Sequence, residues 1–89
     1  MHETSIMTNL MRKIETVAKE NQSDQVTGVH VRLGALSHFT EEHFQEHFLI
    51  ASKGSIAEGA KLYIAMDDNI NAPTAQDVWL EEIDLAASH

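Results

Sequence analysis

The chain has 89 residues, which is enough for a single small domain spanning residues 1–89 and too few for two. Its formal charge of -8 argues against nucleic acid or an anionic membrane surface as a partner, because both attract Lys and Arg. It contains no cysteine, so disulfides and thiolate zinc sites are excluded and no zinc is expected. No apolar run approaches the roughly 20 residues of a membrane span, and the first residues lack the pattern of a signal peptide, which together predict a cytoplasmic protein.

The first three residues, Met1, His2 and Glu3, form a candidate metal site. The α-amine of Met1 and the amide nitrogen and imidazole of His2 can close fused chelate rings around one cation, and Glu3 adds a carboxylate. A planar, nitrogen-rich set of this kind suits Ni(II) or Cu(II). The alternative is a tripeptide frayed in solvent, which the three residues alone favour.

A helix is expected directly after this tripeptide, with Thr4 or Ser5 as its N-cap. Apolar residues then recur at spacings of three and four, which is typical of an amphipathic helix packed on a core. These residues are Ile6, Met7, Leu10, Met11, Ile14, Val17 and Ala18. We interpret the methionines as core filling and not as metal ligands.

From 25 to 33 the period changes to two, which predicts a half-buried strand. Val29, Val31 and Leu33 share the face that would receive the first helix. His30 falls on the opposite face, and we interpret it as an ordinary strand histidine, because no other candidate ligand is near it in the sequence.

A second helix is expected after Thr40, a good N-cap residue, with Phe39 and Phe44 at the spacing of a hydrophobic staple and an end near Gly54. The apolar stripe of this helix comprises Phe44, Phe48 and Ala51, helped by Leu49 or Ile50.

His43 and His47 lie four residues apart on this second helix, so their rings share a face, with Glu46 beside them. Two histidines at this spacing can grip a metal, but no third ligand is fixed by spacing, and a solvated helix face is the favoured interpretation. His43 and Glu46 also suggest a small acid–base enzyme, which nothing besides their proximity supports. His38, in the preceding loop, is a further possible ligand.

Two more strands are expected, from 60 to 66 and from 78 to 85, joined by a polar turn that contains the only proline. The apolar alternation of the last strand shifts phase around Glu81 and Glu82, which indicates a β-bulge. The short link between the two strands suggests an antiparallel, hairpin-like pair. The predicted fold is α+β, a two-layer sandwich of two helices on a sheet of about three strands in the order α-β-α-β-β, with a poorly covered face and an open edge that favour dimerisation or partner docking.

Taken in order, several pieces of the sequence resemble the HypA/HybF family of nickel-insertion proteins of hydrogenase maturation. The pieces are Met1-His2-Glu3 with Ser5 and a helix, then Val29-x-Val31-x-Leu33-Gly34-x-Leu36-Ser37, a helix with Phe44 and Phe48, and Ala57-Glu58-Gly59-Ala60-x-Leu62-x-Ile64. The ordered set covers about the first two thirds of the chain.

The resemblance implies a nickel metallochaperone, not an enzyme, that acts with a maturation GTPase and a hydrogenase large-subunit precursor. It also implies that Ni(II) is held by His2, with Glu3 beside it and the Met1 amine near. Some members add a carboxylate near the start of the second helix, where this chain has Thr40 followed by Glu41 and Glu42.

The chain departs from the family pattern in one respect. Members carry a zinc-binding lobe with two Cys-x-x-Cys pairs between the last two strands, where this chain has only the short link from Asp67 to Gln76. It therefore resembles the nickel-binding domain without the zinc lobe. An interaction or regulatory module on the same fold that binds no metal is the alternative interpretation.

Overall fold

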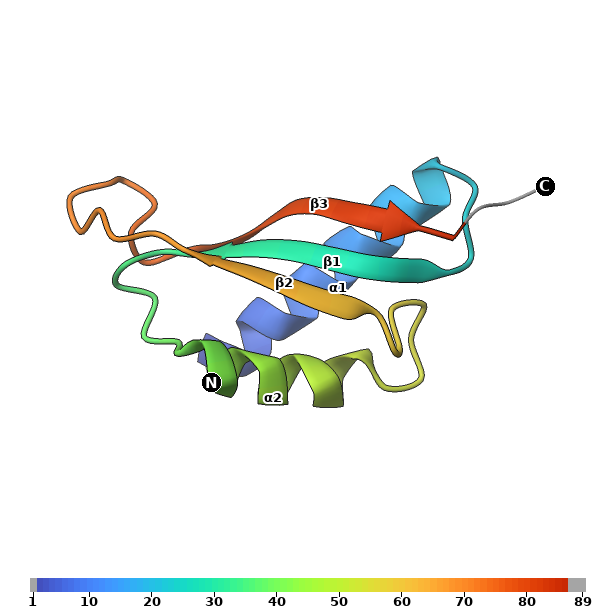
Figure 1. The fold of residues 1–89 in the computed structure, drawn as a ribbon, viewed down its shortest axis with the longest axis horizontal. Helices are drawn as coiled ribbons and strands as arrows, with labels where there is room; N and C mark the ends of the chain where they lie inside the picture. The colour runs from blue at the N-terminus through green and yellow to red at the C-terminus, as the bar shows by residue number, and fades with distance from the viewer. Residues whose placement is uncertain (1, 87–89) are drawn as a thin grey trace.

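The computed structural model describes residues 2–86, and the side chains of residues 5–86. The elements follow in the order α1 (His2–Glu20), β1 (Val26–Leu33), α2 (Glu41–Ser52), β2 (Lys61–Met66) and β3 (Val78–Leu85). This is the expected α+β arrangement of two helices and a three-stranded sheet. Figure 1 shows the three strands side by side, with α1 running behind them and α2 below. None of the helices within residues 2–86 is long and apolar enough to cross a membrane.

The first helix begins earlier than expected. It starts at His2, so Thr4 and Ser5 lie inside it and the prediction that one of them is the N-cap is wrong. The first turn of α1 therefore includes the backbone of His2 and Glu3 from the candidate metal-binding tripeptide.

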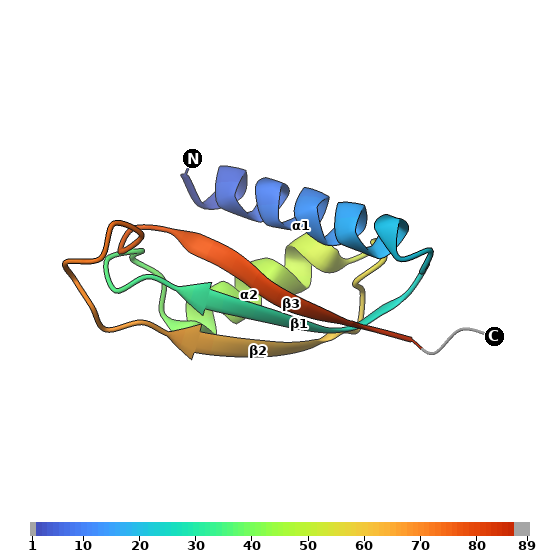
Figure 2. The ribbon, with the colours of Figure 1, turned by 90° about the horizontal axis from the view of Figure 1, so that it is seen from above.

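The core lies between the two helices and one face of the sheet, as the apolar spacing predicts. From α1 it receives Met7, Leu10, Ile14 and Ala18, and from β1 it receives Val26, Val29, Val31 and Leu33. Phe44 and Phe48 of α2 complete it, and Phe44 is fully buried. Both helices therefore pack on the same face, and Figure 2 shows α1 along one side of the sheet, with no element of residues 2–86 covering the other side.

The sheet has the order β2-β1-β3, with β1 parallel to β2 and antiparallel to β3. The expected hairpin of the last two strands is wrong, because β2 and β3 lie on opposite sides of β1 and share no hydrogen bonds. A strand, a helix and a strand in succession pair in parallel as a rule, and β1, α2 and β2 follow that rule. The link after β2 then carries the chain across the end of β1 to the other edge.

The predicted bulge in β3 is confirmed. His30 pairs with Glu82 and Val31 pairs with Leu80, so Glu81 is the extra residue on β3. The pairing of β1 with β3 has a second register shift, which lies on β1 between Val26 and Gly28. The β3 bulge returns both halves of the strand's apolar alternation to the helix-covered face.

The second helix is capped as predicted but buries a different set of residues. The hydroxyl of Thr40 accepts a hydrogen bond from the amide of His43 at 3.1 Å, and Phe39 meets Phe44 edge to face with ring centroids 5.3 Å apart. Neither Leu49 nor Ile50 helps the apolar stripe, since their side chains are 71% and 75% exposed. Ser52 lies on the buried face instead, next to Phe48 in helical spacing.

The loop after β1 packs against the link between β2 and β3. The amide of Gly34 donates to the carbonyl of Asp77 at 2.8 Å, and the amide of Leu36 donates to the carbonyl of Ala75 at 2.6 Å. Ala75 is buried, although the rest of this link is largely exposed. The link is therefore anchored by backbone hydrogen bonds at its end, just before β3.

Candidate metal centre

The backbone of the predicted N-terminal site forms the first turn of α1. His2 and Glu3 are helical, whereas Met1 and the side chains of His2 and Glu3 lie outside the described residues. The first four amides of a helix have no carbonyl partner within it, because such a partner would lie four residues earlier. The His2 amide is one of these, so forming α1 does not consume that nitrogen.

The rest of α1 attaches this first turn to the core. Met7, Leu10 and Ile14 are buried at helical spacing against the sheet. Burial of each such side chain contributes about 1.5–3 kcal/mol. This buried face fixes the orientation of α1 relative to the sheet, and with it the position of its first turn.

His43 and His47 are brought together on α2, as their spacing predicts. Their Nε2 atoms lie 2.9 Å apart and their ring centroids 4.5 Å apart. Both rings are half-buried and pack near Phe39, whose ring centroid is 5.8 Å from that of His43 and 6.2 Å from that of His47. The two histidines are thus less solvated than a polar helix face would leave them.

The other candidates around α2 point to solvent. His38 is exposed and has a positive φ of 67° in the loop before the helix, and Glu41, Glu42 and Glu46 are exposed on α2. Among the residues with described side chains, no three or more His, Cys, Asp or Glu residues come close enough to hold a metal together.

His30 takes part in a cluster on the uncovered face of the sheet. Its Nε2 lies 2.9 Å from a carboxylate oxygen of Asp84, and its ring stacks on Tyr63 with centroids 4.3 Å apart and planes within 8°. Gly28 makes room for this contact, since a β-carbon there would come within 2.3 Å of the same Asp84 oxygen. Sequence reasoning missed this cluster, because Asp84 is 54 residues away and its register depends on irregular pairing.

An ion pair lies at the β3 bulge on the same strand pair. The Nε of Arg32 donates to a carboxylate oxygen of Glu81 at 2.8 Å. This hydrogen bond and the charge of Glu81 raise the pKa of Arg32 above its ordinary value. Both side chains are more than a third exposed, so the pair contributes little stability.

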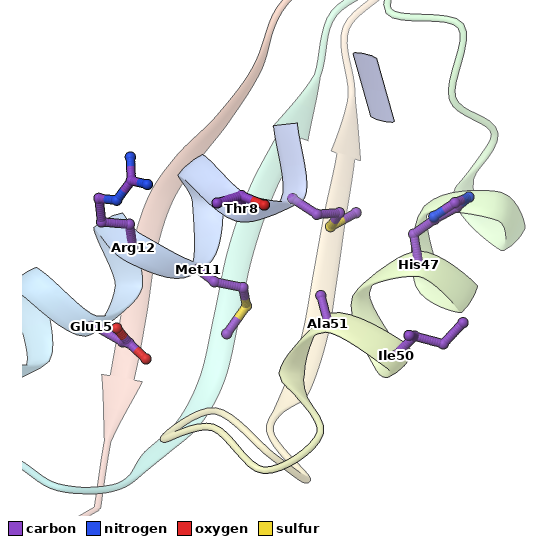
Figure 3. Close-up of a pocket in the computed structure, with 8 residues that line it drawn as sticks. Thr8, Met11, Arg12, Glu15, His47, Ile50 and Ala51 are labelled. Atoms are coloured by element: carbon purple, nitrogen blue, oxygen red, sulfur yellow. The ribbon is translucent and has the colours of Figure 1, made fainter. Parts of the chain in front are cut away.

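A cleft of about 520 Å³ separates α1 from α2. Figure 3 shows Thr8, Met11, Arg12 and Glu15 on α1 and His47, Ile50 and Ala51 on α2 lining it. One of the paired histidines thus lies at the edge of a hollow between the two helices.

Comparison with known proteins gives the family. Residues 1–72 match the family described as hydrogenase/urease nickel incorporation, metallochaperone, hypA. The chain is 45% identical over 67 residues to the hydrogenase maturation factor HypA of Archaeoglobus fulgidus, covering 75% of this chain and 61% of that protein. It is 36% identical over 64 residues to hydrogenase maturation factor HypA 1 of Bradyrhizobium diazoefficiens, covering 72% of this chain and 57% of that protein.

A solved structure shares the fold. The solution structure of the Ni metallochaperone HypA from Helicobacter pylori superimposes with a TM-score of 0.80 and 19% identity, covering 97% of this chain and 98% of that chain. The chain spans about three fifths of the length of the curated relatives it matches. The family description names a metallochaperone and not an enzyme, in agreement with the expectation from the sequence. Because the match extends over residues 1–72 of the 89, this chain belongs to the HypA family.

Proposed function

We propose that this chain binds Ni(II) through Met1, His2 and Glu3 and acts as an accessory protein in hydrogenase maturation. The observation that carries the proposal is the match to a nickel-incorporation family, which begins at residue 1 and so includes the whole tripeptide. The start of α1 at His2 supports it, because the amide needed as a ligand has no acceptor within the helix.

The charge of the ligand set suits its place at a helix start. The positive end of a helix disfavours a bare cation. The proposed ligands include an ionised His2 amide and the Glu3 carboxylate, whose two negative charges balance those of Ni(II). The complex is then close to neutral, so the helix start no longer opposes binding.

The same donors hold Cu(II) at least as well as Ni(II), following the usual order of affinity for divalent ions. The metal carried is therefore set by supply and by partners rather than by this site alone. By resemblance, the partners are a maturation GTPase and the precursor of a hydrogenase large subunit, and the protein works in the cytoplasm.

The proposal is tested by calorimetric titration of Ni(II) into protein with a free Met1 amine. We expect His2→Ala, and separately acetylation of the amine, to weaken binding by at least about a hundredfold, because losing a ligand costs no less than losing a residue that only orients one. His38→Ala is the matched control, since His38 is exposed and lies outside the tripeptide. Equal affinity of His2→Ala and unmodified protein would contradict the proposal.

A second candidate function is that of an interaction module that binds no metal in cells. It is favoured by the exposure of Leu49 and Ile50, two large apolar side chains next to each other on α2. Exposed apolar groups that cluster often mark partner surfaces. If this surface carries the function, Leu49→Glu with Ile50→Glu abolishes capture of the maturation GTPase, whereas His2→Ala leaves capture and hydrogenase maturation unchanged.

A further inference from the structure

The outer edge of β3 is open along its first three residues. β3 is an edge strand, so no other strand in the described part of the chain pairs with this side of it. The amide of Gly34 donates to the carbonyl of Asp77, which makes Trp79 a residue that exchanges both its backbone hydrogen bonds with β1. The backbone groups of its neighbours Val78 and Leu80 therefore face outward, away from the sheet.

The two halves of β3 differ in how well this edge is protected. A bulge at Glu81 interrupts the strand directly after Leu80. Beyond the bulge, Glu82 and Asp84 add negative charge to the strand. Bulges and charged side chains are the usual devices that keep another chain from pairing with an edge. The stretch from Val78 to Leu80 has neither a bulge nor a charged side chain, so this is where a strand can be added.

A hollow of about 460 Å³ lies between this open edge and α1. On the β3 side it is lined by the three residues of the open edge, and on the α1 side by a stripe at helical spacing. The residues of the stripe are Ile6, Asn9, Leu10 and Lys13. Domains that bind peptides by strand addition combine the same two features, an open strand edge and room for alternate side chains beside it.

Charges at the two ends of the hollow restrict the peptide that fits. Figures 1 and 2 show α1 and β3 running in the same direction, so Lys13, the last residue of the stripe, lies toward the Leu80 end. Asp77 lines the other end, directly before β3. A matching peptide has an acidic side chain near Lys13 and a basic one opposite Asp77. An apolar side chain between them contacts Ile6 and Leu10.

We propose that the start of β3 binds an extended segment of a partner protein, added antiparallel to the strand. From its N-terminus the segment has an acidic residue, a spacer, an apolar residue and a basic residue. In this register the acidic and apolar residues lie opposite Leu80 and Val78, on the face toward α1, and the basic residue lies opposite Asp77. Binding here uses none of the ligands of the proposed Ni(II) site.

The test titrates the blocked pentapeptide Thr-Glu-Thr-Val-Lys into the full chain. Trp79 is the one tryptophan of the sequence and lines the hollow, so its fluorescence reports binding. We expect a saturable change, and we expect Lys13→Glu to weaken binding about fivefold, because a repulsion replaces an attraction between exposed charges. Lys19→Glu is the matched control, since it makes the same charge change at an exposed position of α1 outside the hollow, and it should bind as the unmodified chain does.

Methylated peptides test whether the contact is strand pairing. The Glu and Val amides of the peptide face β3 in the proposed register, so N-methylation of either should abolish binding, whereas N-methylation of the middle Thr should leave it unchanged. Three results would overturn the proposal. They are the absence of a saturable change up to about 1 mM peptide, an equal loss in Lys19→Glu, and equal binding of all the methylated peptides.

Discussion

Gly34 lies so close to Ala75 that a β-carbon on Gly34 would come within 2.3 Å of the Ala75 carbonyl oxygen. That oxygen accepts the hydrogen bond from Leu36, so it cannot move away without losing a backbone contact. The contact joins the loop after β1 to the link before β3. It shows that the absence of a side chain at Gly34 is needed for the two segments to pack.

Gly34→Ala should therefore lower the free energy of unfolding by about 1–3 kcal/mol, the usual cost of forcing extra atoms into a packed site. Gly59→Asn is the control, because the space around Gly59 is open and Asn tolerates its positive φ of 80°. The measurement is urea denaturation followed by circular dichroism. If both variants unfold at the same urea concentration, the close approach of Gly34 to Ala75 does not affect the free energy of unfolding.

Thr40→Ala should lower the free energy of unfolding by about 1 kcal/mol, because it removes the hydroxyl that caps the amide of His43. Thr40→Ser keeps the hydroxyl and should retain most of the stability. Thermal unfolding of the three proteins at the same pH compares them. A Ser variant as unstable as the Ala variant would show that the methyl group, not the cap, is responsible.

Ni(II) binding at the N-terminal tripeptide should release about two protons per ion near pH 7. An α-amine is mostly protonated there and the His2 amide fully so, and both must lose their protons to coordinate. Affinity therefore weakens as pH falls. Calorimetry in buffers of different ionisation enthalpy measures the release.

Acetylation of the Met1 amine is the matched control, because it removes one of the ligands that must lose a proton. Release of fewer than about one proton per ion in the unmodified chain would contradict Ni(II) binding at the tripeptide.

The chain should hold no stoichiometric zinc after exhaustive dialysis against a chelator. It has no cysteine, so the thiolate ligands of the family's zinc lobe are missing from it. Elemental analysis of the dialysed protein measures this directly. Retention of about one zinc per chain would require a nitrogen and oxygen site of high affinity, and would refute this prediction.

The sequence predicted those features that depend on short spacing. The stripe of α1, the cap at Thr40 and the meeting of His43 with His47 each involve residues at most four positions apart. The bulge at Glu81 was also predicted, because a shift in the apolar alternation within one strand is a local feature of the sequence.

Features that depend on which strands meet were not predicted. The contact of His30 with Asp84 requires the antiparallel register of β1 and β3, which spacing alone cannot give. The supposed hairpin of β2 and β3 failed for the same reason, because a short link is compatible with either a neighbouring or a more distant strand. The exposure of Leu49 and Ile50 also required the packing of α2, since apolar character alone suggested burial.

Every strand of the sheet takes its alignment from β1, because β2 and β3 each bond to it and not to one another. The chain between the two outer strands is held by backbone hydrogen bonds near its ends, from the Asp67 amide to Leu33 and from the Gly34 amide to Asp77. It could be lengthened by a separately folding insert, or kept as short as it is here, while the surface built from the two helices stays the same. A fold in which both outer strands pair with one central strand can gain or lose a lobe between them without a change in the rest of the domain.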